Sequence, residues 1–289
     1  MNTANSQPVT IICNDKQTIN ANVFAPAGPI KSAVMIAPAT GIKQQFYRNF
    51  ASYLQAQGYG VITYDNRGIG ASLNGNIKKN KATLQCWGEQ DMPAVLEHLQ
   101  ATFSNTRYHL VGHSAGGQLI GLMHNAEQLS SMFNFACSSG KLTNMPLAYQ
   151  FKAHFFMNFF IPASNLLFGH AKSQWVGMGQ PLPKGVAKQW RAWCNGQGYV
   201  KTAFGKTVFQ HQYNDLTLPS FWLNAADDDI ANDINVADMI SVFPKLPAQT
   251  LNVQPKEYGL KEIGHMKFFS KRSEILWPIA LEWLDKHSN

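Results

Sequence analysis

Short apolar runs alternate with amphipathic stretches along most of this 289-residue chain. Runs rich in Val, Ile, Leu and Phe that are bounded by turn residues predict β-strands. Eight such runs occur, at residues 9–13, 19–25, 33–37, 60–65, 108–112, 132–137, 220–225 and 249–254. The turn sequence "NDKQ" between the first two runs favours an antiparallel hairpin at one edge of the sheet.

Helical patterns fill the gaps between these predicted strands. Apolar residues recur at spacings of three and four in residues 43–58, 84–103, 115–129, 234–243 and 272–287. Strands that alternate with helices are typical of a mainly parallel sheet covered by helices on both faces. The sequence therefore predicts an α/β fold with a mostly parallel, eight-stranded sheet.

One long segment breaks this alternation. Between residues 143 and 214 aromatic residues crowd together, and Gly and Pro interrupt the patterns at 177–185. A structureless loop of that length is uncommon in a compact domain. We therefore expect a helical cap at 143–214, inserted into a core formed by residues 1–142 and 215–289.

Composition limits the partners and the location of the protein. The net charge is +7, and Lys and Arg occur throughout the chain, which indicates a solvated basic surface and no nucleic-acid partner. Polar residues and Pro162 interrupt the most apolar stretch, 147–169, so we expect no membrane span. The start of the sequence lacks a signal-peptide pattern, and the four cysteines are widely spaced. Both features favour a cytoplasmic protein, while the oligomeric state is not predicted.

The stretch "GHSAGG" (112–117) places Ser114 between a predicted strand and a predicted helix. A G-x-S-x-G sequence at such a turn holds the serine in a strained conformation that projects its hydroxyl. Gly112 and Gly116 would let strand and helix approach closely, and the N–H of Ala115 would be free to bind an oxyanion. Ser114 is therefore a candidate nucleophile, and the alternative is a small residue that merely joins the two elements.

A serine hydroxyl becomes a nucleophile when a base, usually a histidine held by a carboxylate, takes its proton. His265 is the candidate base, because it lies between the last predicted strand and the last predicted helix. Three carboxylates follow the strand at 220–225, and chemistry alone leaves Asp227, Asp228 and Asp229 open. The other histidines are expected to be structural or solvated, including His113 beside the nucleophile.

These motifs resemble those of the α/β-hydrolase superfamily, over essentially the whole chain. "GHSAGG" resembles the nucleophile elbow, "YDNRGIGAS" (64–72) the turn after the fourth strand, and "IGHMKFF" (263–269) the loop of the catalytic histidine. The stretches from "APATG" (37–41) to "RGIGAS" and "WVGMGQPLPKGVAKQWRAWC" (175–194) are similar to a bacterial group of the serine aminopeptidase-like, S33-type class. The resemblance implies an α/β-hydrolase fold with a cap, but a fold does not determine a substrate.

The resemblance also implies roles for single residues. In the acid turn of the family an aspartate lies four residues before a proline; Asn232 stands at the proline position, which makes Asp228 the match. Because that proline is missing, Asp227 and Asp229 remain alternatives. Many relatives carry His-Gly after the third strand, and alignment of "APATG" with that motif makes Thr40 the second oxyanion donor.

The chemistry implied is a two-step acyl transfer by Ser114, His265 and Asp228, with the oxyanion bound by the N–H groups of Ala115 and Thr40. It requires no metal and no organic cofactor. The Phe, Met and Trp residues of the cap favour an apolar pocket, and hence an ester or thioester of a small apolar molecule. The cap lacks an acidic cluster for a peptide amine, which disfavours an aminopeptidase. An acyltransferase and a non-catalytic ligand- or partner-binding protein are the remaining alternatives.

Overall fold

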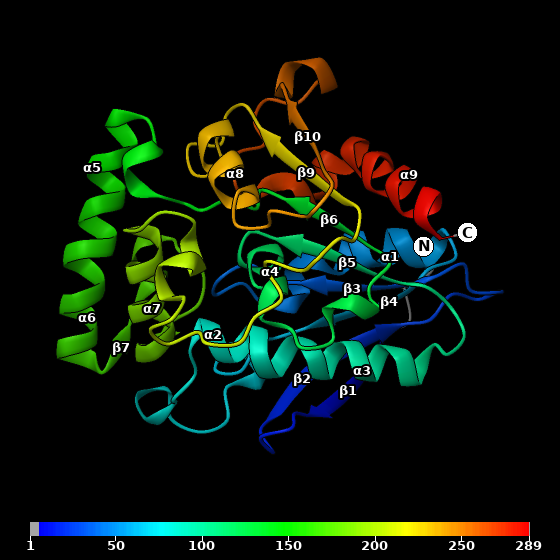
Figure 1. The fold of residues 1–289 in the computed structure, drawn as a ribbon, viewed down its shortest axis with the longest axis horizontal. Coiled ribbons are helices and arrows are strands. Elements are labelled where there is room, and N and C mark those ends of the chain that lie inside the picture. Colours follow the sequence, from blue (N-terminus) through cyan, green and yellow to red (C-terminus); the bar gives the residue numbers. More distant parts are fainter. Residues whose placement is uncertain (1–5, 289) are drawn as a thin grey trace.

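The computed structural model describes residues 6–288, and it places the eight predicted strands in one sheet (Figure 1). We expected no signal peptide at the start of the sequence, and residues 1–5 of that stretch lie outside the described range. The strand order is β1 (Ser6–Ile12), β2 (Thr18–Phe24), β4 (Gly60–Tyr64), β3 (Ala33–Ala37), β5 (Tyr108–His113), β6 (Ser131–Phe135), β9 (Ser220–Ala225) and β10 (Ala248–Val253). β1 forms the expected hairpin with β2, β2 pairs antiparallel with β4, and the remaining neighbours are parallel. The predicted mostly parallel sheet is confirmed.

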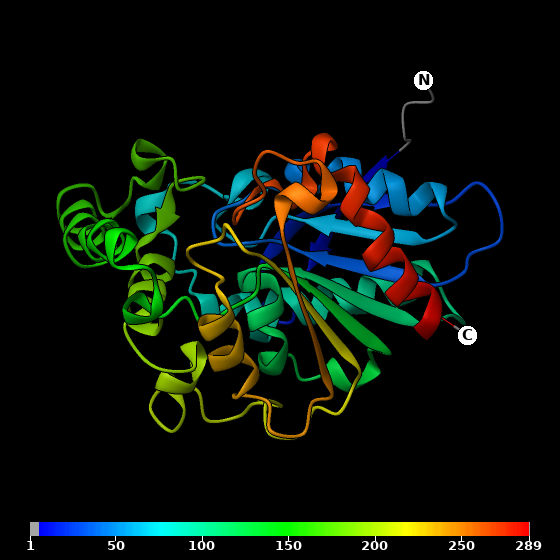
Figure 2. The same ribbon diagram turned by 90° about the horizontal axis from the view of Figure 1, so that it is seen from above.

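Helices cover both faces of the sheet (Figure 2). One face carries α1 (Arg48–Ala56) and α9 (Trp277–His287), and the other carries α3 (Met92–Thr102) and α8 (Asp233–Ile240). β3, β4 and β6 are buried at every position, which explains their continuous apolar sequences. Aromatic rings join α1 to the sheet and to α9, since Phe50 lies 5.6 Å from Phe135 and 5.5 Å from Trp277 between ring centroids.

Several predicted helices contain turns of another type. These turns are η1 (Gln44–Tyr47) before α1, the π-helical η4 (Trp87–Asp91) between α2 (Leu84–Cys86) and α3, and η13 (Lys271–Leu276) before α9. The helix predicted at 115–129 is wrong beyond residue 118. Only α4 (Ala115–Gln118) is α-helical there, and the short 3-10 turns η5 (Ile120–Leu122) and η6 (Ala126–Gln128) follow it.

Glycine explains why this helix ends early. Gly116, Gly117 and Gly121 have low helix propensity, and the ring of Tyr213 packs directly over Gly121. The carbonyl of Gly121 accepts a hydrogen bond of 2.6 Å from the N–H of Gln212. It therefore bonds to a distant segment and not to the N–H four residues further along a helix.

The chain between β6 and β9 forms a separate group of helices beside the sheet, on the left in Figure 1. It contains η7 (Leu142–Asn144), α5 (Leu147–Phe155), the π-helical η8 (Phe156–Phe160), α6 (Ile161–Phe168), η9 (Ser173–Val176), α7 (Lys184–Cys194) and η10 (Tyr199–Ala203). A two-stranded antiparallel pair, β7 (His170–Ala171) and β8 (Leu182–Pro183), lies within it. Among residues 6–288, no helix has the length and apolar character needed to cross a membrane.

Buried ionic contacts fix the loop that follows β4. Arg67 donates to the fully buried carboxylate of Asp91, 2.6 Å from Nε to Oδ1, and pairs with Asp15 in the β1–β2 turn. Asp65 accepts the N–H of Gln44 at 2.7 Å. The "DNRGIG" turn (65–70) thus contacts three other parts of the chain: the β1–β2 hairpin, Gln44 after β3, and η4 before α3.

Candidate active site

Ser114 lies at the sharp turn from β5 into α4. Its backbone dihedrals are φ 49° and ψ −117°, a strained combination for a residue with a side chain. A Cβ at position 116 would overlap the carbonyl oxygen of Ala37, and one at position 112 would overlap the backbone of Gly117. The two glycines therefore allow α4 to pack tightly on β3 and β5, as the motif predicts.

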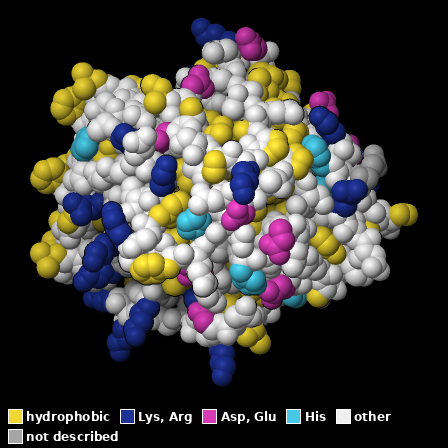
Figure 3. Space-filling model, in the orientation of Figure 1, with side chains coloured by type: hydrophobic (Ala, Val, Ile, Leu, Met, Phe, Trp, Pro, Cys, Tyr) yellow, Lys and Arg dark blue, Asp and Glu magenta, His cyan; other side chains and the backbone are white. Residues whose placement is uncertain are grey.

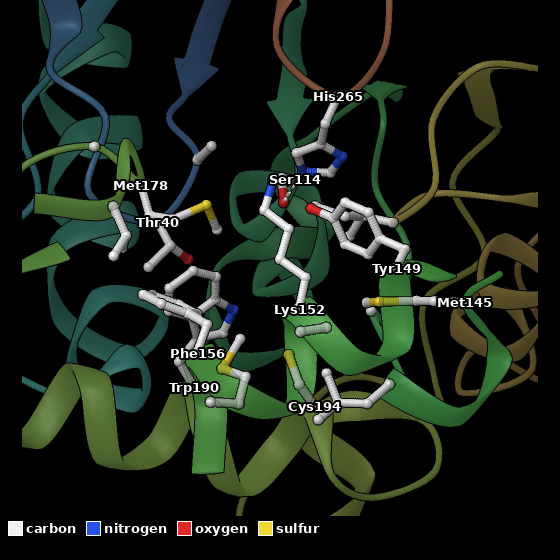
Figure 4. Close-up of a pocket in the computed structure, with 18 of the residues that line it drawn as sticks. Thr40, Ser114, Met145, Tyr149, Lys152, Phe156, Met178, Trp190, Cys194 and His265 are labelled. Carbon is white, nitrogen blue, oxygen red and sulfur yellow. Dashed lines mark hydrogen bonds between the residues drawn. The ribbon is translucent and has the colours of Figure 1, made fainter. Parts of the chain in front are cut away.

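Ser114 forms a hydrogen-bonded chain with His265 and Asp228. Nε2 of His265 lies 3.0 Å from Oγ of Ser114 (Figure 4). On the other side of the ring, Nδ1 of His265 lies 2.8 Å from Oδ2 of Asp228. A carboxylate can only accept, so Nδ1–H donates to Asp228, and in the neutral ring Nε2 accepts the Ser114 hydroxyl proton. The three side chains follow β5, β9 and β10, whose carboxyl ends meet at one edge of the sheet.

The carboxylate of Asp228 is buried but well supplied with donors. Its Oδ1 accepts the N–H groups of Ile230 and Ala231, each at 2.9 Å. Burial by itself would raise the pKa of Asp228, but the charge and hydrogen bond of His265, together with these two N–H groups, lower it below its ordinary value. Asp228 is therefore ionised at neutral pH and keeps the His265 ring in one tautomer.

The two neighbouring aspartates have other surroundings. Asp227 accepts the N–H groups of Ile263 and Gly264, both at 2.9 Å, and so supports the loop that carries His265. Asp229 is exposed. Asn232, at the position where relatives carry proline, accepts the N–H of Asn235 and caps α8. Of the three candidate acids, the structure places Asp228 against His265.

The backbone N–H groups of Thr40 and Ala115, the two candidate oxyanion donors, are both without a partner in the described chain. Within residues 6–288 neither N–H donates to another protein group. Ala115 is the first residue of α4, where N–H groups have no helical partner, and Thr40 lines the same cavity as Ser114. An unpaired N–H beside a serine hydroxyl can stabilise an oxygen that gains negative charge, and Thr40 brings a second unpaired N–H to the same cavity.

Sequence reasoning missed the partners of His113, which is fully buried. Its Nδ1 lies 2.9 Å from the hydroxyl of Tyr47, and that hydroxyl accepts the N–H of Ala39 at 2.8 Å. Its Nε2 lies 2.9 Å from the carbonyl oxygen of His265. Burial, reinforced by the charge of His265, lowers the pKa of His113 to about 3, so the ring is neutral. No motif indicated Tyr47.

A cavity of about 470 Å³ opens beside Ser114 and His265. Its walls are mostly apolar, and the segment 143–214 contributes Met145, Phe156, Met157, Met178, Trp190 and Cys194 (Figure 4). Lys152 extends into it toward Ser114, and none of the described lining residues is acidic. The expectation that Phe, Met and Trp of this segment line a pocket is confirmed.

A mostly parallel eight-stranded sheet with a serine on the sharp turn after β5 defines the α/β-hydrolase fold. Within that class, the chain belongs to the serine aminopeptidase S33 family of hydrolases, whose model matches residues 28–178, slightly more than half of the chain. The protein is therefore a hydrolase of the α/β-hydrolase class.

Solved structures support the same fold. DcsB, solved in complex with its substrate analogue, is 15% identical with a TM-score of 0.66, over 98% of this chain and 99% of DcsB. The Pyrococcus furiosus esterase Pf2001 is 12% identical with a TM-score of 0.61, over 99% and 94%. An esterase from Thermogutta terrifontis is 17% identical with a TM-score of 0.59, over 98% and 100%. Such identities establish the fold alone, and no protein with a curated description matches the sequence.

Proposed function

We propose that the protein is a serine hydrolase that cleaves an ester or thioester of a small, apolar acyl substrate through an acyl-enzyme. The observation that carries this proposal is the chain of hydrogen bonds from Ser114 through His265 to Asp228, at 3.0 and 2.8 Å. A buried acceptor behind the base and free N–H donors beside the nucleophile are the remaining components of acyl-transfer catalysis.

The chemistry follows from these contacts. Oγ of Ser114 attacks the carbonyl carbon while Nε2 of His265 takes the hydroxyl proton, and Asp228 stabilises the resulting imidazolium. The N–H groups of Ala115 and Thr40 bind the oxyanion. When the tetrahedral intermediate collapses, the leaving alcohol or thiol receives the proton from His265. Water then attacks the acyl-enzyme with the same proton transfers, which releases the acid and restores the serine.

The cavity supports an acyl ester more than a peptide. A peptide with a free amino terminus needs a carboxylate to bind its ammonium group, and the described lining residues include none. The volume lies within the usual range for small-molecule pockets, and the apolar walls suit an acyl or aryl group. We include in the proposal that residues 143–214 form a cap over a core made of 1–142 and 215–289.

Labelling with a fluorophosphonate probe tests the proposal. We expect the wild-type protein to be labelled and Ser114→Ala and His265→Ala to lose the label, whereas His124→Ala, at an exposed histidine, retains it. A series of p-nitrophenyl esters of increasing chain length then measures the size of the acyl pocket. A folded wild-type protein that takes no label would overturn the proposal. Faster cleavage of amino-acid p-nitroanilides than of matched esters would instead identify an aminopeptidase.

A further inference from the structure

Exposed apolar side chains are concentrated on one segment of the surface. Thirteen large hydrophobic residues within 6–288 are exposed, and nine of them lie between positions 147 and 209. We call eight of these the apolar strip: Leu147, Phe151, Phe155, Phe159, Leu166, Leu167, Trp175 and Val176. Phe151 is 73% exposed and Leu166 is 84% exposed. Single exposed apolar residues are common, but a group of this size marks an interaction site.

The strip follows the outer edge of α5, η8 and α6 and ends on η9. Residues four apart lie on one side of a helix, as do Leu147, Phe151 and Phe155, and the rings of Phe155 and Phe159 stack with centroids 6.4 Å apart. Figure 3 shows hydrophobic side chains protruding along the left edge of the molecule, where Figure 1 places α5 and α6, with Lys and Arg side chains beside them. The sheet and its helices lie on the opposite side, so nothing in the described chain covers this edge.

The excess of basic over acidic residues lies entirely in residues 143–214, the segment that carries the apolar strip. The chain has 24 Lys and Arg residues and 17 Asp and Glu residues. Residues 143–214 contain seven of the basic residues and no acidic residue, so the rest of the chain has 17 of each and is neutral. Basic residues occur throughout the sequence, but the whole excess of +7 belongs to the segment that carries the apolar strip.

Lysines lie directly beside the apolar strip. The Nζ of Lys172 lies 4.0 Å from the ring centroid of Trp175 and 3.9 Å from that of Phe168. The side chain of Lys78 packs against Gly169 at the end of α6. Aromatic and aliphatic side chains are thus interspersed with cations at one edge of the molecule.

From this arrangement we infer that the apolar strip docks on the surface of an anionic phospholipid bilayer. Phe, Leu and Trp side chains insert at the boundary of headgroups and acyl chains, while adjacent lysines bind anionic headgroups. A nucleic acid would use the charge but leave the apolar residues exposed. Pairing of two strips would bring two segments of charge +7 together, which is electrostatically unfavourable.

The strip is continuous with the mouth of the cavity. Lys152, Phe155 and Val176 are exposed and also line the cavity beside Ser114. Docking would therefore turn the cavity mouth toward the bilayer, where acyl chains are concentrated. The binding step does not depend on the proposed hydrolysis, so each can be tested without the other.

Vesicle flotation tests the inference with the full chain. We expect the protein to float with vesicles of phosphatidylcholine and phosphatidylglycerol, to float weakly with phosphatidylcholine alone, and to be released as salt increases. Phe151→Ser combined with Phe159→Ser and Leu166→Ser should reduce the bound fraction at least tenfold. The control replaces exposed apolar residues elsewhere, Ile12→Ser, Ile234→Ser and Ile275→Ser, and should leave binding unchanged.

Charge is tested separately. Lys78→Gln with Lys172→Gln should weaken binding to the mixed vesicles, whereas Lys256→Gln with Lys261→Gln, exposed lysines after β10, should not. Ser114→Ala should bind like the wild type, which separates docking from catalysis. Absence of vesicle binding, equal binding to both vesicle types, or equal binding by the strip variant would overturn the inference. Dimerisation that the strip variant abolishes, without vesicle binding, would show that the strip pairs with a second copy instead.

Discussion

The ring of His113 donates a hydrogen bond to the backbone carbonyl of His265, with Nε2 and O 2.9 Å apart. Since a carbonyl can only accept, the proton lies on Nε2, and Nδ1 of the neutral ring must accept the hydroxyl proton of Tyr47. Tyr47 in turn accepts the N–H of Ala39. These three hydrogen bonds therefore connect the backbone of Ala39, which precedes Thr40, to the backbone of His265. They hold Ala39 and His265 in position relative to Ser114.

Breaking this chain should slow catalysis without removing any reacting group. We expect His113→Leu to lower kcat on p-nitrophenyl acetate by about 10- to 100-fold with little change in KM, because small displacements of a catalytic group are costly. His113→Gln should recover part of the loss, since an amide can still donate to the His265 carbonyl. A kcat unchanged in His113→Leu would contradict this positioning role.

Tyr47→Phe should affect stability as well as rate. It leaves the Ala39 N–H and His113 Nδ1 buried without a partner, which should lower the free energy of unfolding by about 1–3 kcal/mol. Urea denaturation measures this change. Tyr53→Phe, on the neighbouring helix α1, is the matched control and should stay within about 0.5 kcal/mol of the wild type.

The three adjacent aspartates should differ sharply on substitution to asparagine. Asp228→Asn should lower kcat by about 10³- to 10⁴-fold, since the amide can favour the wrong tautomer of His265. Asp227→Asn should have a smaller effect, because one oxygen remains to accept an N–H of the His265 loop, and Asp229→Asn should have none. Steady-state kinetics on one ester compares all three. A larger loss in Asp227→Asn than in Asp228→Asn would reverse the assignment.

Two buried neutral histidines should make the protein labile to acid. Burial, with smaller effects of His287 and Arg107, lowers the pKa of His109 to about 3, and the pKa of His113 is also about 3. In the unfolded chain a histidine takes up its proton near pH 6.5. The unfolded state therefore binds more protons between about pH 6.5 and 3, and stability must fall as the pH falls through that range.

Urea titrations at several pH values between 7 and 4 measure this dependence. Each of His109→Gln and His113→Gln should reduce the slope of unfolding free energy against pH by up to about 1.4 kcal/mol per pH unit. The double variant should reduce it by the sum. Slopes equal to that of the wild type would mean that these histidines become protonated within the folded protein.

Gly116→Ala should disrupt the turn at Ser114. The added methyl group would overlap the carbonyl of Ala37, so the start of α4 must move, at a cost of about 3 kcal/mol. The same movement displaces the N–H of Ala115, so ester hydrolysis should fall as well. Gly28→Ala, where nothing lies within 4 Å of the new atom, is the control and should be nearly neutral in both thermal denaturation and activity.

The sequence was sufficient for features that depend on local patterns. Continuous apolar runs predicted the strands of the sheet. The sharp turn at Ser114 was predicted from Gly112 and Gly116, because a strand and a helix can approach this closely only where side chains are absent. The short-range pattern failed at 115–129, where glycines weaken the helix and Gly121 contacts Gln212 and Tyr213, residues more than ninety positions away. Periodicity within a window cannot include such a contact.

Contacts between distant segments were likewise not predictable. Tyr47 sits in an ordinary amphipathic stretch, and its link to His113 exists only after β3, β5 and the loop after β10 are assembled. Chemistry alone left Asp227, Asp228 and Asp229 open. In the structure the carboxylate of Asp228 faces the ring of His265, whereas that of Asp227 accepts backbone N–H groups of the loop that carries His265.

The direct pairing of β6 with β9 has a consequence for how this chain can diverge. These strands are parallel neighbours, and such a pair needs a crossover connection of about a dozen residues. Here the connection runs from residue 136 to 219. The connection is several times longer than the crossover requires, so a change of its length or sequence need not break a strand pair. Because this connection also supplies much of the cavity wall beside Ser114, we expect changes of selectivity to be tolerated there more readily than in the strands that hold Ser114.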